Sequence, residues 1–371
     1  MSGQLQSFRD QVWRFFRAKR PSLSNGLLLI AAGGLGDLIL LRYVLPRFLK
    51  FADKNEPVTL LVVGSAKKMA FLMPKSLEII DVDFNKLRKN NAYRYQVMQK
   101  IYDRHYRRVI SLDYLRHPLA DEALMLAASA DTVWAMQSRA WAKYQKLLNK
   151  NLKKFDKVCA TGPEHTDKIL RLADFADQLS GEKSDLPVLK LDLTELKSAA
   201  QKKRPLYIFQ PFSAVKAKQS GPDVYLKIIQ LLPENADILI TGAPDDLESN
   251  RDFKVLLEAP NVRFEDALFE DLVGFLRAAD LVVSVDTAVM HLSAGLGAPT
   301  LCLASAAYVG EIVPYAHEIS PSNVTVLYTP MPECQGCLGD CVLPFEQGRY
   351  ACVDRLDVER IEQAVKKFIQ S

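Results

Sequence analysis

The residues best placed to do chemistry follow a buried strand pattern in the second half of the chain. Leu281–Val285 is an apolar, β-branched run of strand length, and it ends at Asp286. Thr287 follows directly and His291 lies four residues later, so both can share one face of a helix. A carboxylate, a hydroxyl and an imidazole there could position an anionic ligand, because doubly wound folds bind anions where a strand ends and a helix begins.

The segments around this turn predict a βαβ unit of a parallel sheet. After Thr287, apolar residues recur every three or four positions, which is the spacing of a helix. Thr287 or Asp286 can cap this helix with a side-chain oxygen. Gly297 then ends it, and Pro299 leads into a second buried strand, Thr300–Leu303. Caps of this kind also occur for structural reasons alone, and a single helical histidine is more often structural than functional.

A second candidate is the glycine-rich turn GGLGD at Gly33–Asp37, which follows the apolar run Gly26–Ala31. Asp37 would lie in the first turn of a helix. A carboxylate at this position either has a structural role, because the helix dipole stabilises its negative charge, or takes a proton from an acceptor hydroxyl. A dinucleotide-binding motif needs a third glycine where Ile39 stands, and an acid where Gly-Ser follows the strand Val58–Val63. Both departures argue against a nicotinamide cofactor.

Together these motifs resemble those of glycosyltransferase family 9, the ADP-heptose:lipopolysaccharide heptosyltransferases. The resemblance is carried, in order, by GGLGD at 33–37, a lysine-containing loop at 210–225, GAPDD at 242–246, SVDTAVMH at 284–291 and a cysteine cluster near the C-terminus. SVDTAVMH is the most specific of the five and GAPDD the least. The resemblance spans nearly the whole chain and implies a GT-B fold, in which two Rossmann-like, doubly wound α/β domains face a central cleft.

The resemblance also implies a reaction, namely inverting transfer of a heptose or related sugar from an ADP-activated donor to a lipopolysaccharide or oligosaccharide acceptor. No metal or other cofactor is required for catalysis. Asp37 would be the catalytic base, with Asp113 as a weaker alternative. Lys218 would stabilise the leaving diphosphate, with Lys216 as a close competitor. The residues implied to bind the donor are Gly34, Gly36, Ser213, Asp246, Asp286, Thr287, Ala288 and His291.

The chain departs from the family pattern at two places. Ala288 replaces a usual glycine, and LASAAY at 303–308 stands where an aromatic-Gly-Pro-Thr turn is common. The second departure leaves the identity of the sugar open. A protein acceptor and a catalytically inactive GT-B scaffold remain as alternatives.

Four of the six cysteines fall within 19 residues near the C-terminus, at Cys334, Cys337, Cys341 and Cys352. The resemblance implies a comparable cysteine cluster in this region, but it does not indicate whether the cluster binds metal. Four thiolates at this spacing suit a structural zinc or iron site. Reduced thiols and disulfides are the alternatives.

Length and composition fit a soluble, cytoplasmic enzyme of 371 residues, because no apolar run reaches the ~20 residues of a membrane helix and no signal peptide is recognisable. We expect an acceptor-binding domain at 1–190 and a nucleotide-sugar-binding domain at 191–350. We expect a C-terminal helix at 351–371 that packs back on the first domain, and a single basic helix at 139–157.

Charge is unevenly distributed along the chain. Residues 1–180 carry 30 Lys and Arg against 17 Asp and Glu, whereas residues 181–371 carry 18 against 27. The first half is therefore expected to face an anionic partner such as a phosphorylated lipopolysaccharide core. No nucleic-acid partner is expected.

Residues 1–20 predict a basic amphipathic helix. Its apolar residues at helical spacing are Leu5, Phe8, Val12, Phe15 and Phe16, and its basic residues are Arg9, Arg14, Arg17, Lys19 and Arg20. Such a helix either lies on an anionic surface, here the inner membrane, or docks on the first domain.

Overall fold

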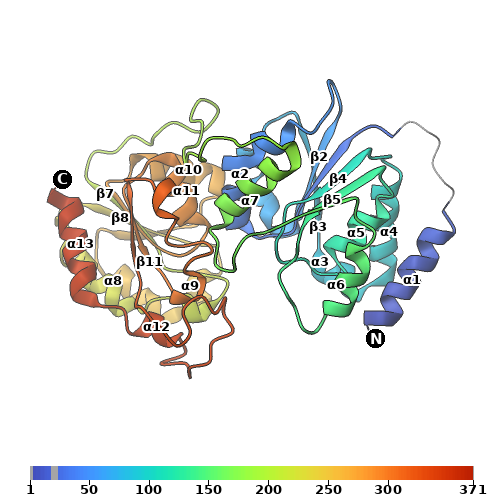
Figure 1. Ribbon diagram of the computed structural model, residues 1–371. Coiled ribbons are helices and arrows are strands. Elements are labelled where there is room, and N and C mark those ends of the chain that lie inside the picture. The colour runs from blue at the N-terminus through green and yellow to red at the C-terminus, as the bar shows by residue number, and fades with distance from the viewer. Residues whose placement is uncertain (1–2, 18–23, 371) are drawn as a thin grey trace. The chain divides into compact units, whose positions relative to one another are not determined.

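The computed structural model describes residues 3–17 and 24–370, so Lys19 and Arg20 of the predicted N-terminal helix lie outside the described residues. The chain divides into two compact α/β units (Figure 1). Unit 1 comprises Met1–Pro163 and Arg171–Asp185, and unit 2 comprises Glu164–Leu170 and Leu186–Ser371. Each unit is built around one parallel six-stranded sheet, in agreement with the predicted pair of doubly wound folds.

The sheet of unit 1 has the order β3-β2-β1-β4-β5-β6, and all of its strand pairs are parallel. Its strands are β1 (Leu27–Ala31), β2 (Val58–Val63), β3 (Leu77–Val82), β4 (Arg108–Ser111), β5 (Thr132–Met136) and β6 (Lys157–Cys159). The helices are α1 (Gly3–Phe15), α2 (Leu35–Leu49), the 3₁₀ helix η1 (Gly64–Leu72), α3 (Phe84–Lys89), α4 (Asn91–Tyr102), α5 (Asp121–Ala127) and α6 (Gln145–Leu152). Helix α7 (Lys168–Ser180) continues from unit 2 into unit 1.

The sheet of unit 2 has the order β12-β11-β10-β7-β8-β9 and is also parallel throughout. Its strands are β7 (Leu206–Gln210), β8 (Asp237–Thr241), β9 (Val262–Glu265), β10 (Leu281–Val285), β11 (Thr300–Leu303) and β12 (Val324–Leu327). Its α-helices are α8 (Pro222–Ile229), α9 (Asp246–Ser249), α10 (Phe269–Ala278), α11 (Ala288–Leu296), α12 (Ala351–Asp354) and α13 (Val358–Gln370). Its 3₁₀ helices are η2 (Lys216–Lys218), η3 (Arg251–Glu258), η4 (Ala306–Tyr308) and η5 (His317–Ile319).

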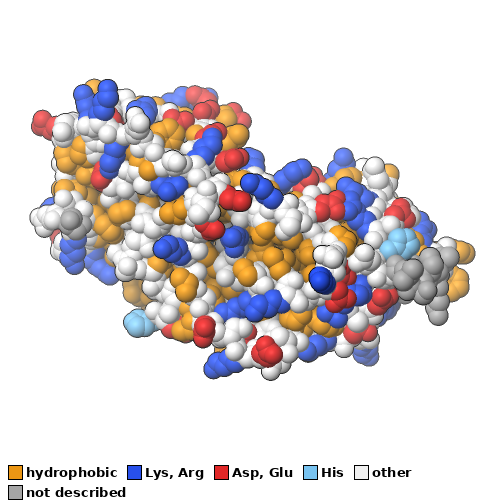
Figure 2. All heavy atoms as spheres, turned by 90° about the horizontal axis from the view of Figure 1, so that it is seen from above, with side chains coloured by type: hydrophobic (Ala, Val, Ile, Leu, Met, Phe, Trp, Pro, Cys, Tyr) orange, Lys and Arg blue, Asp and Glu red, His pale blue; other side chains and the backbone are white. Residues whose placement is uncertain are grey.

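The central strands are mostly apolar because helices cover both faces of each sheet. In β1 the residues Leu27, Leu28, Leu29 and Ile30 are inaccessible to solvent, and β10 is buried from end to end. Such continuous runs are typical of parallel strands that are covered on two sides. Polar side chains are therefore displaced to the strand ends and to the surface, where apolar, basic and acidic groups are interspersed (Figure 2).

Both sheets reverse their winding direction between their first and fourth strands. In unit 1 this point lies between β1 and β4, and in unit 2 it lies between β7 and β10. Ligands of open α/β sheets bind outside the carboxyl ends of the strands at this switch point. The fold therefore directs attention to the segments that follow these four strands.

One sequence prediction is wrong in this part of the molecule. The expected helix at 139–157 is shorter, because α6 covers only Gln145–Leu152 and β6 begins at Lys157. The C-terminal helix α13 belongs to unit 2. It packs against α8 and β12, and its residues Ile361, Ala364 and Val365 belong to the core of unit 2.

Within residues 3–17 and 24–370, every helix is too short or too polar to cross a bilayer.

A buried carboxylate holds the amino ends of the central strands of unit 1 together. Glu56 accepts hydrogen bonds from the Gly26 amide at 2.9 Å and the Asp53 amide at 2.8 Å, and it forms an ion pair of 2.6 Å with Arg107. Burial by itself raises the pKa of Glu56, but the hydrogen bonds from Arg107 and the two amides outweigh it and lower the pKa to about 2. Glu56 thereby links the starts of β1 and β4 to the turn before β2.

We expect Glu56→Gln to remove part of the acid sensitivity of the protein. A pKa that is lower in the folded than in the unfolded chain contributes stability above the ordinary value of 4.5, and this is lost as the pH falls toward about 2. Thermal unfolding midpoints of the variant should therefore vary less with pH across this window. The exposed Glu234→Gln is the matched control and should retain the wild-type slope; equal slopes in all three proteins would contradict the assignment.

Candidate functional site

A buried ion pair lies at the switch point of unit 2. Lys218 ends η2 in the loop after β7, and Asp286 directly follows β10. The Lys218 Nζ lies 2.9 Å from the Asp286 Oδ2 and donates a second hydrogen bond of 2.9 Å to the Asp286 carbonyl oxygen. Both side chains are at least nine-tenths buried. Two segments 68 residues apart in the sequence therefore meet as a charged pair where the fold favours ligand binding.

The segment after β11 completes the surroundings of this pair. The Ser305 hydroxyl donates to Asp286 Oδ2 at 3.2 Å, and the Lys218 Nζ lies 4.4 Å from the centre of the Tyr308 ring. Burial raises the pKa of the Asp286 carboxyl above its ordinary value, and Lys218 and Ser305 oppose this only in part. Asp286 Oδ1 is buried and has no hydrogen-bond partner among the described residues. An unsatisfied buried oxygen is costly, and it marks a place where a ligand or water group can bind.

The sequence analysis missed Ser305 and Tyr308, although both lie in LASAAY, the stretch that departs from the family pattern. Their position after a strand adjacent to β10 was the available signal. Because parallel strands end at the same edge of the sheet, the segments after β10 and β11 must lie close together.

The first turn of α11 lacks the expected side-chain cap. Thr287 is in the N-cap position, but its hydroxyl interacts with the Ser284 hydroxyl at 3.3 Å and the Val285 carbonyl oxygen at 3.4 Å. Ala288 is the first helical residue. The amide groups that open a helix carry partial positive charge and bind anions well when no side chain caps them. The first turn of this nine-residue helix therefore provides backbone donors next to Asp286 and Lys218.

His291 lies one turn further along α11 and is buried. Its Nδ1 lies 2.7 Å from the Tyr315 hydroxyl, which also contacts the Met290 sulfur at 3.8 Å. This contact fixes the orientation of the imidazole and joins α11 to the segment before η5. The described contacts therefore assign His291 a positioning interaction with Tyr315.

The remaining predicted donor residues of unit 2 stabilise their own loops. Ser213 Oγ accepts a hydrogen bond from the Val215 amide at 3.2 Å, and Asp246 Oδ2 accepts one from the Ala243 amide at 2.7 Å. The Lys216 Nζ donates to the Ser249 carbonyl oxygen at 2.6 Å and lies on the exposed side of η2. Lys218 is thus the lysine of this loop that points toward β10.

In unit 1, Asp37 lies in the first turn of α2, directly after β1. Its Oδ2 accepts a hydrogen bond of 2.7 Å from the Gly34 amide, and its side chain is partly exposed. Gly36 lies within the same helical turn. A Cβ atom on Gly33 would lie 2.4 Å from Asp37 Cβ and 2.6 Å from its Cγ. Only glycine at position 33 leaves room for the carboxylate, which is a requirement that the spacing of the motif did not reveal.

Asp113 follows β4 on the other side of the same switch point. It is buried, and its Oδ2 accepts a hydrogen bond from the Ala32 amide at the end of β1. The Asp113 carboxylate therefore anchors the turn that precedes Asp37. This arrangement makes Asp113 a supporting residue for the position of Asp37.

Binding of a metal by the four clustered cysteines stays a prediction. All six cysteines of the chain are free thiols. In the described part of the chain, no group of three or more His, Cys, Asp or Glu side chains is arranged so that it could hold a metal ion. Cys352 lies buried in α12, where its sulfur accepts a hydrogen bond from the Ala306 amide at 3.3 Å, while Cys334 and Cys341 pack against the core of unit 2. These contacts hold the three cysteines beside the core of unit 2.

Comparison with known proteins identifies a family. Residues 96–334 match the model of glycosyltransferase family 9 (heptosyltransferase). No curated protein matches the sequence significantly.

Solved structures with the same fold cover almost the whole chain. The ADP-heptose lipopolysaccharide heptosyltransferase II of E. coli is 14% identical with a TM-score of 0.66, over 93% of this chain and 98% of its own. The family 9 glycosyl transferase of Veillonella parvula is 15% identical with a TM-score of 0.66, over 95% of this chain and 100% of its own. The E. coli heptosyltransferase WaaC, solved with ADP, is 17% identical with a TM-score of 0.64, over 92% of this chain and 99% of its own. At these identities the likeness establishes the GT-B fold.

We expect Lys218→Ala to destabilise the protein by about 3–5 kcal/mol, because it leaves the Asp286 carboxylate buried without its cation. Lys216→Ala removes an exposed lysine from the same 3₁₀ helix and should change the free energy of unfolding by less than about 0.5 kcal/mol. Denaturant unfolding measures both. The double variant Lys218→Ala/Asp286→Ala should recover part of the loss, and strictly additive losses would contradict a coupled pair.

Gly33→Ala should destabilise the protein by about 1–3 kcal/mol, because the new methyl group overlaps Asp37 and forces the turn to move. Gly64→Ala is a suitable comparison, since its added Cβ would lie 3.8 Å from the nearest atom, the Val82 carbonyl oxygen. Chemical unfolding of both variants measures their free energies of unfolding. Equal stabilities would mean that the turn accommodates a side chain at position 33.

Proposed function

Because the chain belongs to glycosyltransferase family 9, the heptosyltransferases, we propose that it transfers a heptose from ADP-heptose to a hydroxyl group of an anionic lipopolysaccharide core. The observation that carries the proposal is the buried Lys218–Asp286 pair beside the uncapped first turn of α11. This combination provides a cation and backbone amides at the switch point of one sheet, which suits a diphosphate. The WaaC structures solved with ADP and with ADP-2-deoxy-2-fluoro heptose support the choice of donor.

Unit 2 binds the donor. The ammonium group of Lys218 has three N–H groups, two of which are directed at Asp286 oxygens, so Asp286 fixes the direction of the third. That donor and the first amides of α11 contact the diphosphate and stabilise the charge that develops on it. Ser213, Asp246, Thr287 and His291 shape the surrounding loops and position the nucleotide-sugar.

Unit 1 binds the acceptor, and Asp37 is the catalytic base. Its carboxylate takes the proton of the acceptor hydroxyl while the oxygen forms a bond to the anomeric carbon of the heptose. The bond from that carbon to the diphosphate oxygen breaks, and ADP leaves with the electron pair. Attack from the side opposite the leaving group inverts the anomeric configuration. The excess of basic residues in the first half of the chain favours a phosphorylated acceptor.

Asp37→Asn should lower the transfer rate by about 10²–10⁴-fold, because the amide cannot accept the proton, while ADP affinity stays within a few-fold of wild type. A coupled assay of ADP release with ADP-heptose and lipopolysaccharide core as substrates measures the rate, and calorimetry measures ADP binding. Gln in place of the exposed Glu234 is the control and should turn over normally. Normal turnover of Asp37→Asn would show that Asp37 is not the catalytic base.

The donor side is tested separately through the two lysines of η2. Lys218→Ala should weaken ADP binding, whereas Lys216→Ala should leave it unchanged. An equal or larger effect at Lys216 would place the diphosphate elsewhere. Replacement of the lipopolysaccharide core by a protein acceptor in the same assay distinguishes the class of acceptor. If the protein hydrolyses no ADP-, GDP- or UDP-sugar, a catalytically inactive scaffold is favoured.

A further inference from the structure

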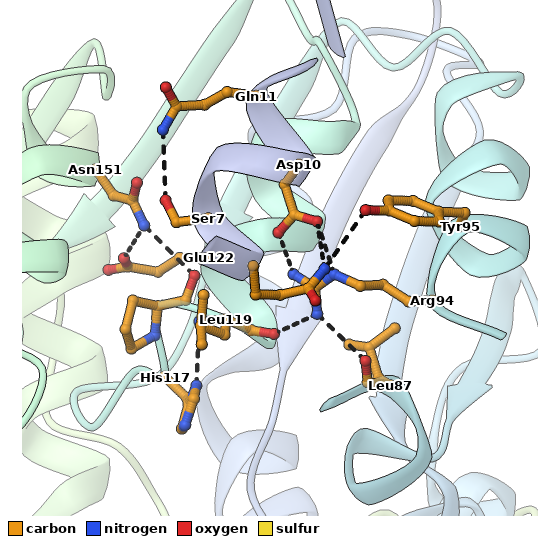
Figure 3. A network of polar contacts seen from close by, with 12 residues as sticks. Ser7, Asp10, Gln11, Leu87, Arg94, Tyr95, His117, Leu119, Glu122 and Asn151 are labelled. Atoms are coloured by element: carbon orange, nitrogen blue, oxygen red, sulfur yellow. Dashed lines mark hydrogen bonds and ion pairs between the residues drawn. The ribbon is translucent and has the colours of Figure 1, made fainter. Parts of the chain in front are cut away.

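Helix α1 is attached to unit 1 by its polar side. Asp10 lies buried in the interface, where the Nε of Arg94 donates to its Oδ1 at 2.9 Å and the Nη2 of Arg94 pairs with its Oδ2 (Figure 3). The Gln6 amide donates to the same Oδ1 at 3.1 Å. Arg94 also donates to the Leu119 carbonyl oxygen at 2.7 Å, which joins α4, α1 and the segment before α5. A buried, bidentate pair of this kind tolerates little displacement.

Aromatic contacts fix the same side of α1. Trp13 stacks on Tyr95 with 6.3 Å between ring centres and meets Tyr102 edge-on at 6.1 Å. Arg17 lies 3.9 Å from the centre of the Trp13 ring and donates to the Gln99 side chain at 2.7 Å. The rotation of α1 about its own axis is therefore determined by contacts along its whole described length.

The opposite side of α1 is apolar and exposed. Its residues and their exposed fractions are Leu5 at 43%, Phe8 at 62%, Val12 at 38%, Phe15 at 82% and Phe16 at 76%. At 100° per residue these five side chains fall on one face, which lies opposite Gln6 and Asp10. In the ranges 3–17 and 24–370, no segment covers this face. Helix α1 thus docks on unit 1, which is one of the two expected alternatives, and the buried Asp10–Arg94 pair turns its apolar side outward.

Basic residues lie on α1 and on the neighbouring helix α6. Arg9 lies beside the apolar residues on α1, and Asp10, the acid of this helix, is already neutralised by Arg94. The amino end of α1 packs beside α6, since a Cβ on Gly3 would lie 3.6 Å from Leu147 (Figure 1). The sequence from 132 to 155 contains no acidic residue, and its six basic residues are Arg139, Lys143, Lys146, Lys150, Lys153 and Lys154. The five lysines are exposed.

The cations of the two helices lie close enough to influence each other. Burial lowers the pKa of Lys154, and the positive charges of Arg14 and Lys150 lower it further. A cluster of like charges of this kind raises the local potential and attracts anionic groups.

We propose that α1 binds in the headgroup region of a bilayer that contains anionic lipid. The five apolar side chains reach the boundary of the acyl chains, and the basic residues of α1 and α6 contact the lipid phosphates. A second copy of this chain fits the surface poorly, because a symmetric contact through α1 would bring two clusters of the same charge together. Membrane binding of this kind is independent of the proposed glycosyl transfer.

The test is co-sedimentation of the full chain with vesicles of phosphatidylcholine, with and without phosphatidylglycerol. We expect binding that requires phosphatidylglycerol and weakens as the salt concentration rises. Phe8→Ser/Phe15→Ser should lower the partition coefficient at least about tenfold, because each phenylalanine loses apolar area that the acyl region would bury. The matched control is Leu186→Ser/Val188→Ser, which removes two similarly exposed apolar side chains from the segment before β7 and should bind as wild type does.

Several results would overturn the proposal. Binding that does not depend on phosphatidylglycerol, or that is equal in both double variants, would exclude the α1 face. Lipid-free sedimentation that shows a dimer of wild type, lost in Phe8→Ser/Phe15→Ser, would assign the face to a second copy. ADP affinity of both double variants should remain at the wild-type value, so that failure of the membrane proposal is distinguishable from failure of the donor site.

Discussion

A parallel sheet that is covered by helices on both faces leaves only the ends of its strands for polar groups, and this constraint governs both units. The central strands β1 and β10 are apolar apart from Ser284 in β10, so acids and lysines appear where the strands stop. At the switch points the chain leaves in opposite directions from neighbouring strands, which opens space between the following loops. Asp37 in unit 1 and Lys218 with Asp286 in unit 2 occupy these positions.

The Lys218–Asp286 pair illustrates the energetic consequence of this constraint. Removal of both charges from water is unfavourable, and the raised pKa of Asp286 reflects that penalty. The ammonium group, the Ser305 hydroxyl and the Tyr308 ring compensate for part of it, while one carboxylate oxygen remains without a partner among the described residues. A pair of apolar residues would stabilise the fold at least as well. We therefore attribute this ion pair to the proposed donor binding rather than to the stability of the fold.

Helix α1 shows how a buried polar pair overrides local amphipathicity. Burial of the phenylalanines would have been favourable, yet the helix buries Gln6 and Asp10 because Arg94 on α4 requires a partner in the interior. Removal of one partner from a buried ion pair typically costs about 3–5 kcal/mol. The sequence pattern of α1 identified its apolar face correctly but could not tell which face the rest of unit 1 would cover.

The sequence by itself determined the strands and their parallel arrangement, since buried β-branched runs are local signals. The predicted bounds of β2, β10 and β11 agree with the structure at both ends. The family and its GT-B fold also follow from motifs that are local. Tertiary structure decided the contacts that join distant segments, because loop conformations and side-chain directions depend on neighbours that no spacing rule specifies. It selected Lys218 over Lys216 as the partner of Asp286, brought Ser305 to that pair, and packed the C-terminal helix on unit 2.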